Sequence, residues 1–227
     1  MAEVGVPKNT QAQTLEAATN PTLNRLYNSK TFRIRGVPLA WDLKQLQGFL
    51  QTFTGDTKPR VSSLALEVNK RSQTATVTFM KASQQLQDRK IWHILVSSDL
   101  DQIEDDSIHL DDGFAGITTL YRPPPDEHII DIIAISGIGD HAFGSFKERG
   151  GNYMWLRDAL PRDIPTARIM IYGYNSTIAN STSMQNLEDF ATSFRDSLLP
   201  LIRSDSIRPI IFIDHSLGGL IVKQVRK

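Results

Sequence analysis

The chain has no cysteine among its 227 residues, so neither a disulfide nor a cysteine-ligated metal site can form. Its 25 basic and 25 acidic side chains leave no net charge, and hence no overall field that attracts nucleic acid or an anionic membrane. No apolar run approaches the roughly 20 residues of a membrane span. The first 30 residues lack the apolar core of a secretory signal. These absences argue against disulfide-stapled and membrane-spanning proteins and allow a reducing compartment.

Apolar residues make up 40% of the chain and charged residues 22%, which is ordinary for a globular protein. The length suits one large or two small domains. Composition shifts along the chain predict four segments. They are a polar tail over 1–30, a small α+β unit over 31–97, an acidic linker over 98–115, and an α/β unit over 116–227. The linker is expected because 99–112 holds seven acidic residues.

The unit over 31–97 has the pattern of a β-α-β-β-α-β fold. Alternating apolar residues predict strands over 32–37, 61–68 and 74–79, with a last strand at 94–96. Helical spacing predicts helices over 41–50 and 82–91. The unit resembles ferredoxin-like, RNA-recognition-motif-like domains, which stack bases on aromatic residues of their central strands. Arg33, Thr74 and Thr76 stand at those positions. We therefore expect a packing or protein-interaction role and no nucleic-acid partner.

From residue 116 onward, apolar strands alternate with helices, which predicts a parallel sheet with right-handed crossovers. Strands are expected over 117–121, 129–135, 167–172 and 209–213, and helices over 153–160 and 187–202. The fold class predicted for the whole chain is α/β, with an incomplete parallel sheet preceded by the smaller α+β unit.

The last of these strands runs into Ser216, and an apolar helical pattern follows it. A serine between a strand and a helix is typical of a nucleophile elbow, a sharp turn that exposes the hydroxyl. Small residues are usual two positions before and two positions after the nucleophile. Gly218 fits the second position, whereas Asp214 occupies the first. The pattern predicts Ser216 as the nucleophile of an ester-hydrolysing site.

A glycine-rich turn after the strand over 129–135 supplies the other expected parts of the site. The backbone N–H of Ile138 or Gly139, together with that of Leu217, is expected to bind an oxyanion. Ser136 and His141, at either end of the turn, are expected to line the pocket. No spacing of histidine and carboxylate residues suggests a metal site, and we expect neither a metal nor a cofactor.

The general base is the missing part. In hydrolases with this elbow the acid and the histidine follow the serine in the chain, and neither residue type occurs after Gly219. His215 is next to the nucleophile and is interpreted as a packing residue. His141 is the first candidate for a substitute base. We expect the chain to be inactive, or nearly so, as an esterase.

Several short motifs together resemble the lipase-like α/β-hydrolase family. The similarity is to the group that includes the inositol deacylases of GPI anchors, a serine-active-site protein of the mitochondrial–endoplasmic reticulum interface, and the N-terminal hydrolase-like domains of fungal NOD-like receptors. Two residues depart from the family pattern, which usually has histidine at Ser136 and glycine at Asp214. The residues that carry the resemblance are 131–139, 155–158, 160–161, 168–170, 172–174 and 215–220.

The resemblance implies serine ester hydrolysis on a lipid or acyl ester, with Ser216 as the nucleophile. It also implies an intracellular place, in the cytoplasm or associated with the membranes of the mitochondrion or endoplasmic reticulum. The alternative is a non-catalytic interaction or signalling module of a larger receptor-like protein, which would bind a protein partner.

Overall fold

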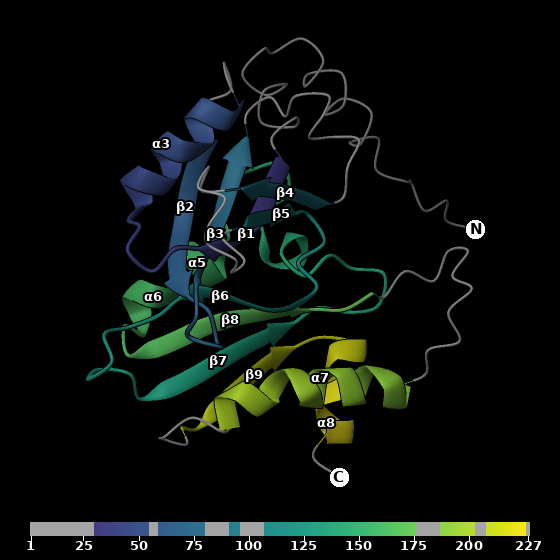
Figure 1. Cartoon of the computed structure of the whole chain (residues 1–227). Coiled ribbons are helices and arrows are strands. Elements are labelled where there is room, and N and C mark those ends of the chain that lie inside the picture. The colour runs from purple at the N-terminus through teal and green to yellow at the C-terminus, as the bar shows by residue number, and fades with distance from the viewer. Residues whose placement is uncertain are drawn as a thin grey trace, which may run out of the picture.

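The computed structural model describes residues 30–54, 59–79, 91–95, 107–175, 187–202 and 208–225. These residues form two sheets, one antiparallel and one mixed, with helices on their faces, so the predicted α/β class is confirmed (Figure 1). Of the expected tail over 1–30, only Lys30 is among the described residues, and it begins the first strand rather than ending a tail. Most of the expected helix over 82–91 lies outside the described residues.

The first sheet has the strand order β2-β3-β1-β5-β4, and every described pairing in it is antiparallel. Helix α3 begins at a reciprocal cap, in which Asp42 Oδ1 accepts the Gln45 N–H and Gln45 Oε1 accepts the Asp42 N–H. The elements are β1 (Lys30–Val37), α3 (Leu43–Thr54), β2 (Pro59–Leu66), β3 (Gln73–Phe79), β4 (Ile91–Leu95) and β5 (Ser107–Asp111).

One strand of this sheet falls where the sequence predicts a linker. Residues 107–111 form β5, which pairs with β1 on one side and β4 on the other. The prediction of a linker over 98–115 is therefore wrong for residues 107–111. The last strand, expected at 94–96, corresponds to β4 at the edge of the first sheet. The physical reason is that Ile108 and Leu110 are fully buried in the core, which outweighs the acidic composition around them.

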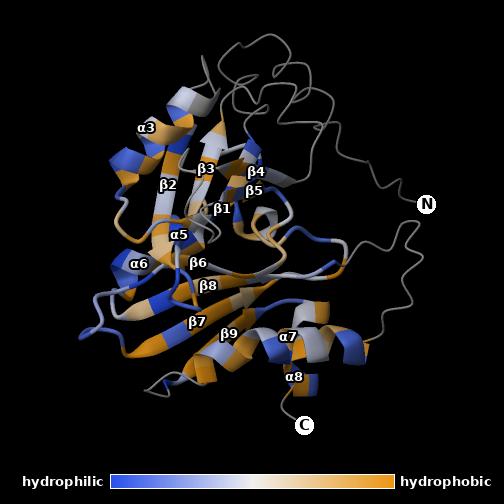
Figure 2. Cartoon of the chain, viewed as in Figure 1, coloured by the Kyte–Doolittle hydropathy of each residue, from blue (hydrophilic) through white to orange (hydrophobic). Residues whose placement is uncertain are grey.

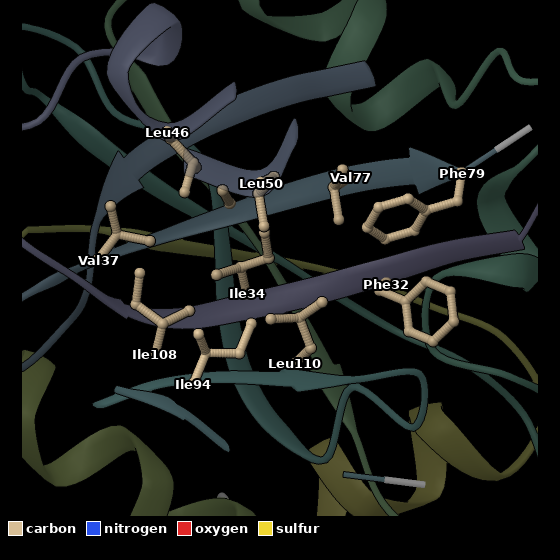
Figure 3. Packing of buried hydrophobic residues seen from close by; sticks show 11 residues of the cluster. Phe32, Ile34, Val37, Leu46, Leu50, Val77, Phe79, Ile94, Ile108 and Leu110 are labelled. Carbon is tan, nitrogen blue, oxygen red and sulfur yellow. The ribbon is translucent and has the colours of Figure 1, made fainter. Parts of the chain in front are cut away.

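The core of the first unit lies between this sheet and α3 (Figure 3). Leu46 and Leu50 of α3 are fully buried against it, as the helical spacing predicts, whereas Leu43 is 47% exposed. The strands contribute Phe32, Ile34, Val37, Ala75, Val77, Phe79, Ile94, Ile108 and Leu110.

The second sheet has the order β6-β8-β7-β9. β7 is parallel to both β8 and β9, as predicted, but β6 pairs antiparallel with β8, so the sheet is mixed. Its elements are β6 (Gly116–Tyr121), β7 (Ile130–Ile135), α5 (Trp155–Asp158), α6 (Leu160–Asp163), β8 (Ala167–Gly173), α7 (Leu187–Ile202), β9 (Ile210–Asp214) and α8 (Leu217–Val225), with a 3₁₀ turn at Gly144–Phe146.

Both faces of β7 and β8 are covered, which explains why these strands are nearly continuous apolar runs (Figure 2). Alternate residues of the two strands pack against α7 and α8 on one face. The residues between them pack on the other face against α5 and the segment between β7 and α5. The carboxyl ends of β7, β8 and β9 therefore meet at one edge, where open α/β sheets place ligands.

A polar layer joins the two sheets. Arg33 of β1 is buried and donates a hydrogen bond to the Asp111 carboxylate. It also donates to Ala115 O at 2.7 Å and to Thr118 Oγ1 at 3.0 Å. Arg157 of α5 donates to Thr76 Oγ1 at 3.4 Å.

The sheet face that stacks bases in RNA-recognition motifs is thus covered by the second half of the chain. Arg33, Thr74 and Thr76 are each at most 4% exposed. A base therefore cannot stack at these positions without separating the two sheets.

Strand β9 leads to a prediction about self-association. Within the described residues β9 pairs with β7 alone, and Ile211 on it is 45% exposed. An apolar strand with an open edge is a template for pairing with another chain. We expect the isolated chain to self-associate at micromolar concentration and Ile211→Lys to shift it toward monomer, as measured by sedimentation velocity. Ile129→Lys, at another exposed isoleucine outside the strands, is the control. A monodisperse parent chain would contradict the prediction.

Candidate active site

Ser216 lies in the turn between β9 and α8, at the carboxyl edge of the second sheet. Its φ is +56°, a left-handed conformation that few non-glycine residues adopt. The side chain is exposed. Leu217 is the first residue of α8, so its N–H has no acceptor within the helix. The strand, the strained turn and the helix have the geometry of the nucleophile elbow predicted from the sequence.

Two glycines allow this turn to pack closely. A Cβ on Gly218 would lie 2.8 Å from Ile135 O, so only glycine lets α8 approach the end of β7. A Cβ on Gly219 would lie 2.5 Å from Asp214 Oδ1. Asp214 therefore places its carboxylate in the space left by Gly219.

The glycine turn after β7 lies against the turn at Ser216. A Cβ on Gly137 would be 2.5 Å from the ring of His215, so the two loops are in contact. Ser136 is buried, and its carbonyl accepts a hydrogen bond from Tyr174 Oη at 2.9 Å. Burial and the nearby Asp140 raise the pKa of Tyr174 to about 12, so the hydroxyl stays protonated as a donor. This bond holds the start of the turn in place.

His215 is not the packing residue that the sequence suggests. Its side chain is 61% exposed, and its Nε2 lies 3.3 Å from Asp140 Oδ2. The interpretation was wrong because it considered only neighbours in sequence, whereas Asp140 belongs to the other loop. The pair joins the turn at Ser216 to the expected oxyanion turn. Asp140 is thus a site residue that sequence reasoning missed.

His141 is occupied by its own surroundings. Its Nδ1 accepts the N–H groups of Phe143 and Gly144, at 3.2 and 2.9 Å. Its Nε2 must then carry the proton, which it donates to Asp112 O. Since both ring nitrogens are engaged, His141 cannot accept a proton from Ser216 without breaking these bonds.

The other described histidines are placed elsewhere. His128 is buried beside Asp131 near the amino end of β7, and burial lowers its pKa. His93 and His109 stack edge to face in the first sheet. In the described part of the chain, no hydrogen bond joins Ser216 to a histidine, and no group of histidines and carboxylates has the arrangement of a metal site.

A cavity of about 670 Å³ opens between the two sheets beside the glycine turn. Gly139 and His141 line it, together with Tyr174. Lys30, at the start of β1, and Asp112, directly after β5, also line it and pair with each other. Ser136 and Ser216 do not line the cavity, and Ile138 is 45% exposed at the tip of the turn. The cavity therefore borders the candidate oxyanion turn.

This arrangement is accompanied by a distant similarity to known proteins. The chain is similar to Protein SERAC1. The cattle (Bos taurus) protein is 25% identical over 113 residues, which are 42% of this chain and 17% of that protein. The mouse (Mus musculus) and human (Homo sapiens) proteins are 32% and 31% identical over 74 residues, which are 31% of this chain and 11% of each protein.

The matches thus span less than a fifth of the length of the curated relatives and support a distant relation. No family model matches the chain, and no solved structure matches it. None of the described helices is both long and apolar enough to cross a membrane.

Proposed function

We propose that the turn at Ser216 is the nucleophile site of a serine ester hydrolase-like domain, whose substrates are lipid or acyl esters. The strained conformation of Ser216 carries the proposal. A non-glycine residue at positive φ costs free energy, and such residues concentrate at functional sites. The distant similarity to Protein SERAC1 is compatible with a hydrolase-like domain.

In this proposal the Ser216 hydroxyl attacks the ester carbonyl and forms a tetrahedral intermediate. The N–H of Leu217 and an N–H of the Ile138–Gly139 turn would stabilise the oxyanion. The His215–Asp140 pair supports this role because it joins the two loops that carry these donors. The base is the part that the described residues do not supply, so turnover by this chain is expected to be negligible.

The competing proposal is an interaction or signalling module in which the same scaffold binds a partner without catalysis. The two proposals differ in what they require of the Ser216 turn. A hydrolase scaffold needs an electropositive turn that stabilises a developing anion, whereas an interaction module does not. The hydrolase proposal also includes association of the protein with the membranes of the mitochondrion or endoplasmic reticulum, whereas the interaction module does not require it.

A cysteine placed at the turn tests this difference. The chain has no native cysteine, so Ser216→Cys carries one thiol. The start of the nine-residue α8 should stabilise the thiolate and lower the thiol pKa below its ordinary value. We expect Ser216→Cys to react with iodoacetamide at pH 7 roughly five- to tenfold faster than a cysteine at an ordinary exposed position.

Ser193→Cys, on the exposed face of α7, is the matched control. The full pH dependence of alkylation gives the pKa of each thiol. Equal pKa values for the two thiols would refute an anion-stabilising turn and favour the interaction module.

A further inference from the structure

A second charged cluster lies at the opposite end of the second sheet from Ser216. Asp131 is near the start of β7, and its register partner on β8 is Arg168. Both side chains are at least nine-tenths buried. Arg168 Nε and Nη2 donate to the two Asp131 oxygens at 2.7 and 2.8 Å, a bidentate pair. His128 Nε2 lies 2.9 Å from the same carboxylate.

These contacts use both oxygens of Asp131. Burial lowers the pKa of His128, so its ring is neutral near pH 7 and its Nε2–H donates to the carboxylate. Arg208 approaches from the segment before β9 and donates to His128 O at 2.7 Å. The carboxylate therefore has little capacity left for a further guanidinium.

Arg122, the residue after β6, adds a third guanidinium to this cluster. Tyr121 pairs with Ile169 in the antiparallel register of β6 and β8, so Arg122 lies beside Arg168. Its Nε is buried and has no hydrogen-bond partner among the described residues. Its pKa is lowered first by burial and then by repulsion from Arg168 and Arg208, while Asp131 is the carboxylate that opposes this shift. A buried donor without an acceptor is unfavourable, and the neighbouring positive charges add to the penalty.

We propose that Arg122, beside Arg168 and Arg208, binds a phosphoryl group, either as free phosphate or as a phosphate ester. The planar fork of arginine matches phosphate oxygens bidentately. The cluster holds three guanidinium groups and one carboxylate, an excess of positive charge that favours a dianion over a singly charged ligand. The site is separate from the turn at Ser216, and its assignment does not depend on the proposed ester hydrolysis.

Titration of the full chain with inorganic phosphate tests the site by calorimetry, with chloride added to hold the ionic strength constant. We expect saturable binding to the parent chain and a weaker effect of acetate. Arg122→Gln should weaken phosphate binding at least tenfold, since a charge-assisted hydrogen bond is lost. Arg122→Lys, which keeps the charge without the fork, should bind with intermediate affinity. Arg149→Gln, at an exposed arginine, should bind like the parent.

Thermal unfolding separates binding from a structural role. Without phosphate, Arg122→Gln should melt at the same temperature as the parent or higher, because it removes a half-buried cation that its neighbouring arginines repel. Phosphate should then raise the melting temperature of the parent and not that of Arg122→Gln. An absence of saturable binding to the parent would overturn the proposal. So would equal phosphate effects in the parent and in both Arg122 variants. A phosphorylated sugar in place of free phosphate shows whether the site accepts an ester.

Discussion

A short-chain p-nitrophenyl ester should be hydrolysed at the same rate by this chain and by its Ser216→Ala variant. An unactivated serine hydroxyl is a poor nucleophile. In the described structure His141 has both ring nitrogens engaged and His215 is paired with Asp140. Loss of the base in a measured serine protease lowers kcat by about 10⁶. A difference of that size places any Ser216-dependent rate below the background of the assay.

Labelling by a fluorophosphonate probe gives an independent measurement, because it reports nucleophile activation without requiring turnover. We expect no labelling of Ser216, with Ser193→Ala as the control for an exposed serine. Stoichiometric labelling that Ser216→Ala abolishes would contradict the expectation. It would mean that a histidine leaves its hydrogen bonds in solution to act as the base, and His215→Gln and His141→Gln would then identify which one.

The second large effect concerns the junction between the sheets. Arg33→Met is expected to lower the free energy of unfolding by roughly 3–5 kcal/mol, because it leaves the Asp111 carboxylate without its buried partner. The substitution also removes the hydrogen bonds to Ala115 O and Thr118 Oγ1, and the cation–π contact with Phe114. Urea unfolding followed by tryptophan fluorescence measures the change.

The matched control is Arg195→Met, which breaks an exposed ion pair with Asp196. Exposed pairs contribute little, so a change of less than about 1 kcal/mol is expected. The double variant Arg33→Met/Asp111→Leu should recover part of the lost stability, since an apolar pair leaves no unpaired charge. An Arg33→Met variant as stable as the control would show that the sheets are held together by apolar packing alone.

The predictable parts of the fold are those with local signals. The apolar runs of β7 and β8 and the order strand, Ser216, helix are visible in the sequence, because burial and turn geometry restrict which residues occur there. Strand β5 was missed although its pattern is present. Ile108 and Leu110 alternate with polar residues, as in a strand with one buried face. The many acidic residues of the surrounding segment are more typical of a linker, and they hide this alternation in the sequence.

Other parts of the site have no local signal. The pairing of His215 with Asp140 joins residues far apart in the chain, and only the packing of two loops brings them together. The same holds for Arg33, whose partners are near β5 and on β6. His141 lines a cavity. Its hydrogen bonds, which decide its chemistry, depend on the backbone path of residues 143 and 144.

The left-handed conformation of Ser216 bears on why a serine is retained there. For a residue with a Cβ this conformation costs roughly 1–2 kcal/mol, whereas glycine adopts it freely. Most proteins have a net stability of only about 5–15 kcal/mol. Replacing Ser216 by glycine would therefore relieve this conformational strain. Selection for stability alone would favour glycine at this position, so the strained serine fits the proposed role of its hydroxyl.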